Sequence, residues 1–221
     1  MIPNKNSRLR VFLRVAAAVA AVAAASLAGL SRSASSASGK PTVTFVSDSV
    51  AASLSYVSSA RATLGHGLTI RYDLKVCRRL VAPSCSFQGT APTTALQAVQ
   101  SYGHALGEVL IVDVGYNDSD HGYAQGIDQI MRTALAQGAT AVVWVTLREA
   151  GTYSGVYHWT NIAIKTAPKR WPQLIVADWN AYSAGRPWFG TDDPHLSSLG
   201  AAKLAAFLRP FVTRALELRH P

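Results

Sequence analysis

The sequence predicts an α/β fold, a three-layer α/β/α sandwich around a parallel sheet of five strands. From Lys40 onward, short runs rich in β-branched residues alternate with segments of helical periodicity. Each run is almost continuously apolar, as strands are when helices cover both faces of a sheet. The expected strands are residues 42–46, 68–72, 109–114, 141–146 and 174–177.

The first and third connections carry apolar residues at the spacing of a helix. One set follows Ser49, and the other precedes Gly138, a natural helix stop. The two sets are Val50, Leu54, Val57 and Leu64, and Ala124, Ile127, Met131 and Ala134.

The other helices are predicted from their ends. Pro92 opens a helix that Gly103 closes. Ser197 is a good N-cap for the last helix, which Pro210 is expected to kink or restart. Together with the five strands, these crossovers predict a doubly wound, flavodoxin-like sheet.

The first forty residues have a different character. Arg8, Arg10 and Arg14 precede an apolar, Ala-rich run, and a stretch of Ser, Ala and Gly follows to Gly39. This is the layout of a secretory signal. We expect residues 1–40 to be a signal peptide, or a membrane anchor through residues 11–30 followed by a small-residue linker, and residues 41–221 to be one secreted or extracytoplasmic domain.

The high net charge belongs mostly to this N-terminal segment. Six of the 21 Lys and Arg residues lie in it, which leaves 15 against 12 acidic residues, a net charge of +3. Because no Arg-rich or aromatic-interleaved motif is present, we expect no nucleic-acid partner. No His-Glu-x-x-His sequence or second Cys/His pair indicates a metal site, so we expect no cofactor. We also expect the protein to be a monomer.

Cys77 and Cys85 are the only two cysteines. In an oxidising compartment they are expected to form a disulfide, which would stabilise the fold by about 2 to 3 kcal/mol because its loop is short. The alternative is two reduced thiols in a surface loop.

Ser49 is the candidate nucleophile. It stands where the first strand meets a helix, so its hydroxyl can face the crevice at the sheet edge and its backbone N–H can point into it. The alternative is that Ser49 only caps the helix. Ser47 and Ser53 are nearby competitors, one at the strand end and one a turn along the helix.

His195 is the candidate base. Asp192 precedes it by three residues in a Pro-containing turn, so its carboxylate can orient the imidazole while the other ring nitrogen takes the Ser49 proton. Asp193 is the alternative orienting acid.

Gly115 and Asn117 follow the third strand. A glycine lets the backbone approach a substrate, and the Asn117 amide can donate to a developing oxyanion. The alternative is an ordinary turn, for which the sequence Gly-x-Asn-Asp is also well suited. Since sites in open α/β sheets form beyond the carboxyl ends of the strands, these clusters are expected to meet at one edge.

The order of these clusters resembles the SGNH hydrolases, also called the GDSL esterase/lipase family. Its sequence blocks match Ser49, Gly115-x-Asn117-Asp118 and Asp192-x-x-His195. The stretch of residues 72–78 is similar to a loop in the extracytoplasmic domains of bacterial peptidoglycan O-acetyltransferases. Two departures stand out, because Ser47 and Cys77 occupy positions where the family usually has glycine.

The resemblance implies an exported serine ester hydrolase. Ser49 would attack an acyl ester, His195 would take and return the proton, and Asp192 would hold His195. The backbone N–H groups of Ser49 and Cys77 and the side chain of Asn117 would then form the oxyanion hole.

The substrate is expected to be a small acyl ester or an acylated cell-wall glycan. Gly115 and Arg148 are candidate substrate-binding residues, and an aromatic segment after the fourth strand offers rings for stacking sugars. For two of these rings, Trp159 and Trp171, helix packing is the favoured interpretation. Two other functions stay open, a non-catalytic glycan-binding domain and an O-acyltransferase that works with a membrane partner.

Overall fold

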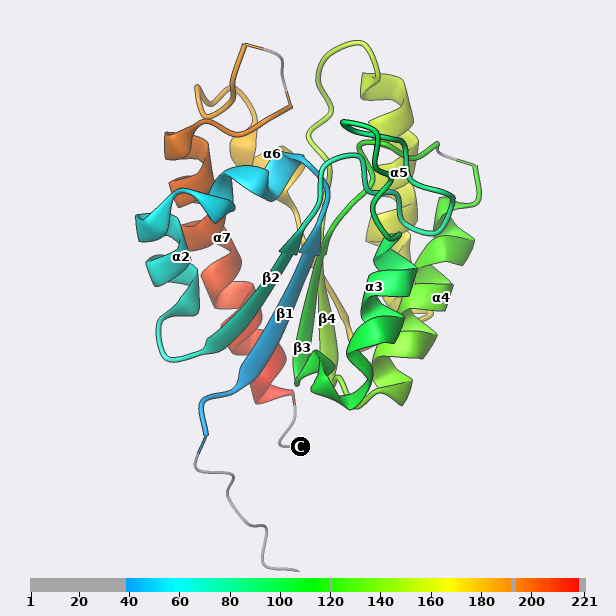
Figure 1. Ribbon diagram of the computed structural model, residues 1–221, viewed down its shortest axis with the longest axis vertical. Helices are drawn as coiled ribbons and strands as arrows, with labels where there is room; N and C mark the ends of the chain where they lie inside the picture. The colour runs from blue at the N-terminus through cyan, green and yellow to red at the C-terminus, as the bar shows by residue number, and fades with distance from the viewer. Residues whose placement is uncertain (1–38, 120, 192–193, 219–221) are drawn as a thin grey trace, which may run out of the picture. The chain divides into compact units, whose positions relative to one another are not determined.

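Five parallel strands form the central sheet, in the order β2-β1-β3-β4-β5 (Figure 1). The computed structural model describes residues 39–119, 121–191 and 194–218. The strands are β1 (Thr42–Ser47), β2 (Thr69–Leu74), β3 (Val109–Asp113), β4 (Ala141–Val145) and β5 (Leu174–Ala177). This order confirms the predicted flavodoxin-like sheet.

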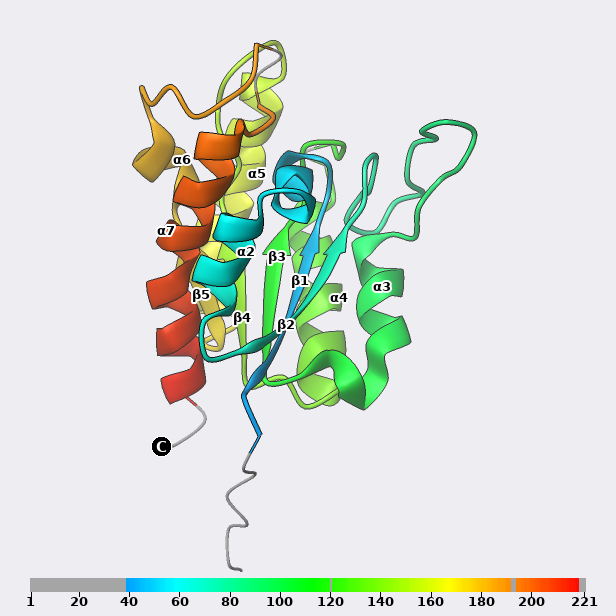
Figure 2. The ribbon, with the colours of Figure 1, turned by 60° about the vertical axis from the view of Figure 1, so that its left-hand side comes forward.

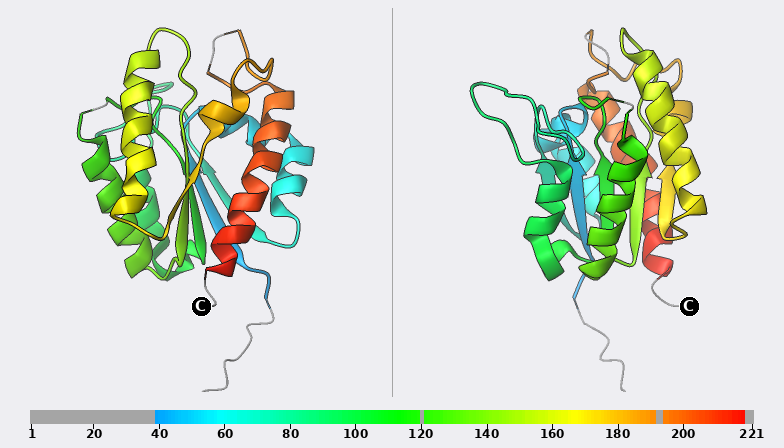
Figure 3. Two further views of the ribbon diagram at one scale, coloured as in Figure 1. Left: turned by 180° about the vertical axis from the view of Figure 1, so that it is seen from behind. Right: turned by 90° about the vertical axis from the view of Figure 1, so that its right-hand side faces the viewer.

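Helices cover both faces of the sheet, which confirms the three-layer sandwich (Figure 3). On one face lie η1 (Val50–Ser55), α2 (Ser58–Gly65), α6 (Trp179–Ser183) and α7 (Ser198–Glu217). On the other lie α3 (Ala95–Tyr102), η2 (Gly103–Leu106), α4 (Tyr123–Ala136), α5 (Ser154–Thr166) and η3 (Ala167–Lys169).

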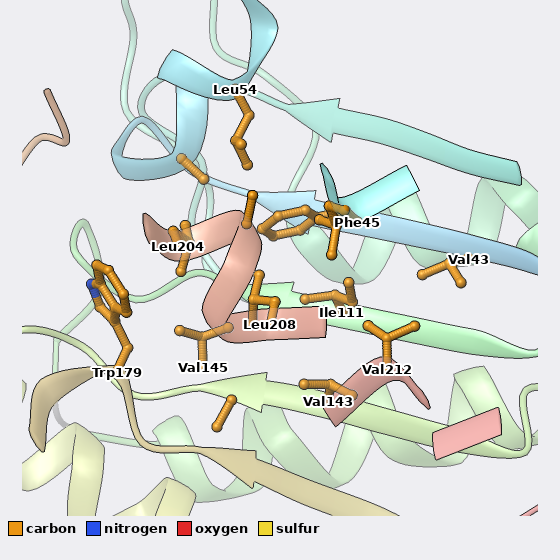
Figure 4. Close-up of a cluster of buried hydrophobic side chains, with 14 of the residues drawn as sticks. Val43, Phe45, Leu54, Ile111, Val143, Val145, Trp179, Leu204, Leu208 and Val212 are labelled. Carbon is orange, nitrogen blue, oxygen red and sulfur yellow. The ribbon is translucent and has the colours of Figure 1, made fainter. Parts of the chain in front are cut away.

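The core beneath α7 explains why this helix continues through Pro210. Leu208 and Val212, on either side of the proline, are both fully buried against the sheet (Figure 4). Pro210 itself is exposed. Packing of the flanking turns therefore outweighs the backbone hydrogen bond that proline removes, and the predicted restart does not occur.

The predicted helix after Ser49 is divided in two. The 3-10 helix η1 ends at Ser55, and α2 begins at Ser58 after Val57, whose backbone is not helical. Serine and β-branched residues are weak helix formers, which favours a break here.

The expectation that both faces of every strand are buried is wrong for β2. This strand forms one edge of the sheet, and its residues are half-buried or exposed. An edge strand has a neighbour on one side only, so Arg71 and Asp73 can alternate with its apolar residues.

Candidate active site

The loops that follow the strands gather at the carboxyl end of the sheet (Figure 2). There the Oγ of Ser49 lies 2.9 Å from the Nε2 of His195, although 146 residues separate them. Both side chains line a cleft of about 290 Å³ together with Asn117. The other lining residues are Val50, Tyr116, Ala150, Thr152, Tyr153, Tyr157 and Pro194.

The hydroxyl of Ser49 does not cap the helix it precedes. Ser49 is the N-cap residue of η1, yet its side chain makes no capping hydrogen bond. The two competing serines are buried: Ser47 donates to the carbonyl of Asp48, and Ser53 is 3% exposed. Of these three hydroxyls, only that of Ser49 belongs to a residue that lines the cleft.

Backbone contacts hold His195 in place. Phe189 and Leu196 form an antiparallel bridge, and the N–H of Gly190 donates to the carbonyl of His195 at 2.7 Å. The guanidinium of Arg148 lies 3.6 Å from the centre of the Phe189 ring. The two carboxylates predicted to orient His195, those of Asp192 and Asp193, lie outside the described residues.

Asp48 joins the two segments that carry Ser49 and Asn117, a role that the sequence did not predict. Its fully buried carboxylate accepts hydrogen bonds from the backbone N–H groups of Val50, Gly115 and Tyr116. Burial raises the pKa of Asp48 to about 6, and these three N–H groups oppose the rise. One carboxylate therefore ties the start of η1 to the loop that carries Asn117. An acidic residue directly after a buried strand was the available signal.

Gly115 packs closely against Leu147 and does not line the cleft. Its φ is +153°, and an added Cβ would lie 2.8 Å from Cδ1 of Leu147. Asn117 does line the cleft, and its Nδ2 donates to the carbonyl of Arg78 at 3.2 Å. That bond uses one of the two N–H groups of the amide, so the second can serve a ligand.

Cys77 and Cys85 form the expected disulfide. Cys77 has φ of +68°, a left-handed conformation that favours glycine. The family that the sequence resembles usually has glycine at this position. Cys77 keeps the left-handed backbone conformation that a glycine adopts easily. The Sγ of Cys85 lies 3.9 Å from Oδ1 of Asn117, which places the disulfide beside the cleft. Cys77 itself is not among the lining residues.

Arg78 lies inside the disulfide loop, directly after Cys77, and anchors it to the rest of the fold. Its side chain is fully buried, and it forms an ion pair of 2.9 Å with Asp73. It also donates to the carbonyls of Asp73 and Thr93. The sequence showed only a basic doublet here, and nothing in that pattern distinguishes a buried arginine from an exposed one.

The aromatic segment divides between the cleft and the surface. Tyr153 and Tyr157 line the cleft, whereas Arg148 does not. Trp171 packs against the core, as expected, and donates to Asp128. Trp159 is 59% exposed, so the expected helix packing is wrong for this ring. It faces outward because α5 turns its other side to the sheet.

Two further acids lie near the site, Asp113 fully buried and Asp118 half-buried. Burial, and after it the neighbouring charge of Asp48, raises the pKa of Asp113 well above its ordinary value. Burial also raises the pKa of Asp118 to about 7, although its carboxylate accepts the N–H of Leu80.

In residues 39–119, 121–191 and 194–218, no group of three His, Cys, Asp or Glu side chains is placed to hold a metal ion. No helix in these ranges is both long and apolar enough to cross a membrane.

The fold is that of the SGNH hydrolases, as the resemblance predicted. No protein-family model and no curated protein matches the chain. Among solved structures, it is similar to the C-terminal catalytic domain of peptidoglycan O-acetyltransferase A from Streptococcus pneumoniae, with 19% identity and a TM-score of 0.59 over 80% of this chain and 93% of that one.

Two esterase structures are similar to the same extent. A carbohydrate acetylesterase family member from Sinorhizobium meliloti matches with 14% identity and a TM-score of 0.60, over 80% of this chain and 99% of that one. The esterase EstA from Pseudoalteromonas matches with 10% identity and the same TM-score, over 80% and 99% of the two chains. At such identities the likeness establishes the fold.

Proposed function

We propose that this protein is an exported serine esterase that hydrolyses short acyl esters, with an acylated glycan as its natural substrate. The observation that carries the proposal is the 2.9 Å contact between Ser49 Oγ and His195 Nε2 in an open cleft. A serine that merely caps a helix bonds to its own backbone, which Ser49 does not do. The fold shared with esterases and an O-acetyltransferase domain adds support.

The chemistry follows from this pair. Ser49 Oγ attacks the ester carbonyl carbon while His195 Nε2 takes the hydroxyl proton. The oxyanion receives hydrogen bonds from Asn117 Nδ2 and from the backbone N–H groups of Ser49 and Cys77, and Asp192 holds the imidazolium. His195 then gives the proton to the leaving alcohol as its C–O bond breaks, which leaves an acyl group on Ser49. Water attacks this ester through His195, the acid departs, and Ser49 regains its proton.

The test is a labelling experiment that needs no knowledge of the natural ester. A fluorophosphonate should label the wild-type protein and not Ser49→Ala, and hydrolysis of p-nitrophenyl acetate should fall by about 1,000-fold or more in that variant. Ser53→Ala is the matched control, because this nearby serine is buried in η1. Equal labelling of wild type and Ser49→Ala would refute the proposal.

A second function has support from the likeness to the O-acetyltransferase domain. In that case the acyl group on Ser49 passes to a sugar hydroxyl in place of water, and a membrane partner supplies the acyl donor. Product analysis with water and a sugar in competition distinguishes the two. Glycan binding without labelling of the wild type would instead favour a non-catalytic binding domain.

A further inference from the structure

The catalytic cleft opens into a longer trough. A second cavity of about 420 Å³ shares Tyr116, Asn117, Tyr153 and Tyr157 with the cleft. A third cavity, of about 400 Å³, shares three other lining residues with the second, namely Arg79, Asp118 and Ser119. The three hollows therefore adjoin one another, and together they offer room for a ligand much longer than a short acyl group.

Arg79 stands where the second and third cavities meet. Its Nε is enclosed and has no hydrogen-bond partner among the residues that the structure describes. The guanidinium of the adjacent Arg78, by contrast, is fully buried and is bonded to Asp73 and Thr93. The Nε of Arg79 is too enclosed for a ligand to reach, so a ligand in these cavities would meet the terminal nitrogens of the same guanidinium.

Asp118 is the acidic residue that lines both of these cavities together with Arg79. Both of its carboxylate oxygens accept the N–H of Leu80, at 3.0 and 3.1 Å. Burial raises the pKa of Asp118 to about 7, so near neutral pH only part of its population carries the negative charge. Asp118 therefore compensates the charge of Arg79 only in part, even though that charge lowers the pKa of Asp118.

We propose that Arg79 forms a subsite for a carboxylate of the substrate, which makes the natural substrate an acylated glycan that contains acidic sugars. An arginine fork matches both oxygens of a carboxylate. Between Ser49 and Arg79 the trough is lined by tyrosines, of which Tyr153 is 64% exposed, and such rings stack on sugar faces. An ester at Ser49 and an acid at Arg79 therefore belong to one extended molecule. This inference rests on the proposed function.

The test compares two acetylated trisaccharides, one built from galacturonic acid and the other from galactose. The readout is the ratio of their kcat/KM values, in which any general loss of activity cancels. Wild type should prefer the acidic trisaccharide, and Arg79→Gln should lower the ratio by roughly tenfold to a hundredfold, the worth of a charge-assisted hydrogen bond. Lys75→Gln is the matched control, because it removes an exposed cation of the same segment that lines none of these cavities.

The outcomes separate this inference from the proposed function. Hydrolysis of p-nitrophenyl acetate with no acidic preference, or with a ratio unchanged in Arg79→Gln, overturns the subsite and leaves the esterase proposal intact. If no ester is hydrolysed, calorimetric titration with tri-galacturonic acid judges the subsite alone. Binding that Arg79→Gln abolishes supports it, whereas equal binding in both proteins, or none, overturns it.

Discussion

Asp48→Asn should change the pH dependence of stability in a defined direction. The wild-type carboxylate accepts hydrogen bonds from Val50, Gly115 and Tyr116 in a fully buried position. Asparagine has the same shape and one acceptor oxygen, so its amide must face one of these N–H groups. That donor-to-donor contact lowers the free energy of unfolding by about 1 to 3 kcal/mol at any pH.

The pH-dependent part follows from the pKa. Burial raises the pKa of Asp48 from 3.8 to about 6. Between these values the folded protein holds a proton that the unfolded chain has released, so its free energy of unfolding falls as the pH rises. The loss is complete above the folded pKa and amounts to about 3 kcal/mol, at about 1.4 kcal/mol per unit of pKa. An asparagine side chain does not titrate, so the variant lacks this loss.

Urea unfolding followed by tryptophan fluorescence measures both proteins between about pH 4 and about pH 8. Relative to Asp48→Asn, wild type should lose about 2 kcal/mol of stability across this range, which cancels most or all of its advantage. Asp128→Asn should show the opposite trend: burial alone would raise the pKa of Asp128, but hydrogen bonds from Trp171 and Arg170 bring it below its ordinary value. Parallel curves for wild type and Asp48→Asn would refute the reasoning.

Three further changes test the supports of the site. Reduction of Cys77–Cys85 should lower the free energy of unfolding by about 2 to 3 kcal/mol in urea, since the bridged residues are only 8 apart. Arg78→Met should lower it by about 3 kcal/mol, because a carboxylate loses its buried cation. Gly200→Ala places a Cβ 1.9 Å from a backbone carbonyl and should lower both Tm and ester hydrolysis, whereas Gly155→Ala, with open space around its Cβ, should lower neither.

Each of these expectations has a contrary result. Equal urea midpoints with and without reductant would mean that the disulfide does not constrain the unfolded chain. A stability of Arg78→Met equal to that of wild type would show that Asp73 finds other partners. Equal behaviour of the two Gly→Ala variants would contradict the close approach of Gly200 to Trp188.

The strands were predictable from their apolar runs, and their order followed from the doubly wound fold class. Parallel strands direct the loops that follow them to one edge of the sheet. The sequence could therefore predict that Ser49, Asn117 and His195 lie close together. The break between η1 and α2 and the unbroken α7 were not predictable, because local propensity and tertiary packing compete there. Asp192 lies outside the described residues, so its role stays a prediction.

The chain's own residue pattern thus predicted the fold class, and it singled out the serine and histidine that the structure brings within 2.9 Å of each other. Folding decided which polar side chains are enclosed, and with what partners. The sequence does not distinguish the surroundings of Asp48, Arg78 and Arg79, because each is a charged residue next to a strand or in a loop. In space, Asp48 and Arg78 are saturated with hydrogen bonds, whereas the Nε of Arg79 has no partner in the described part of the chain. Desolvation and pairing depend on neighbours distant in sequence, which periodicity does not record.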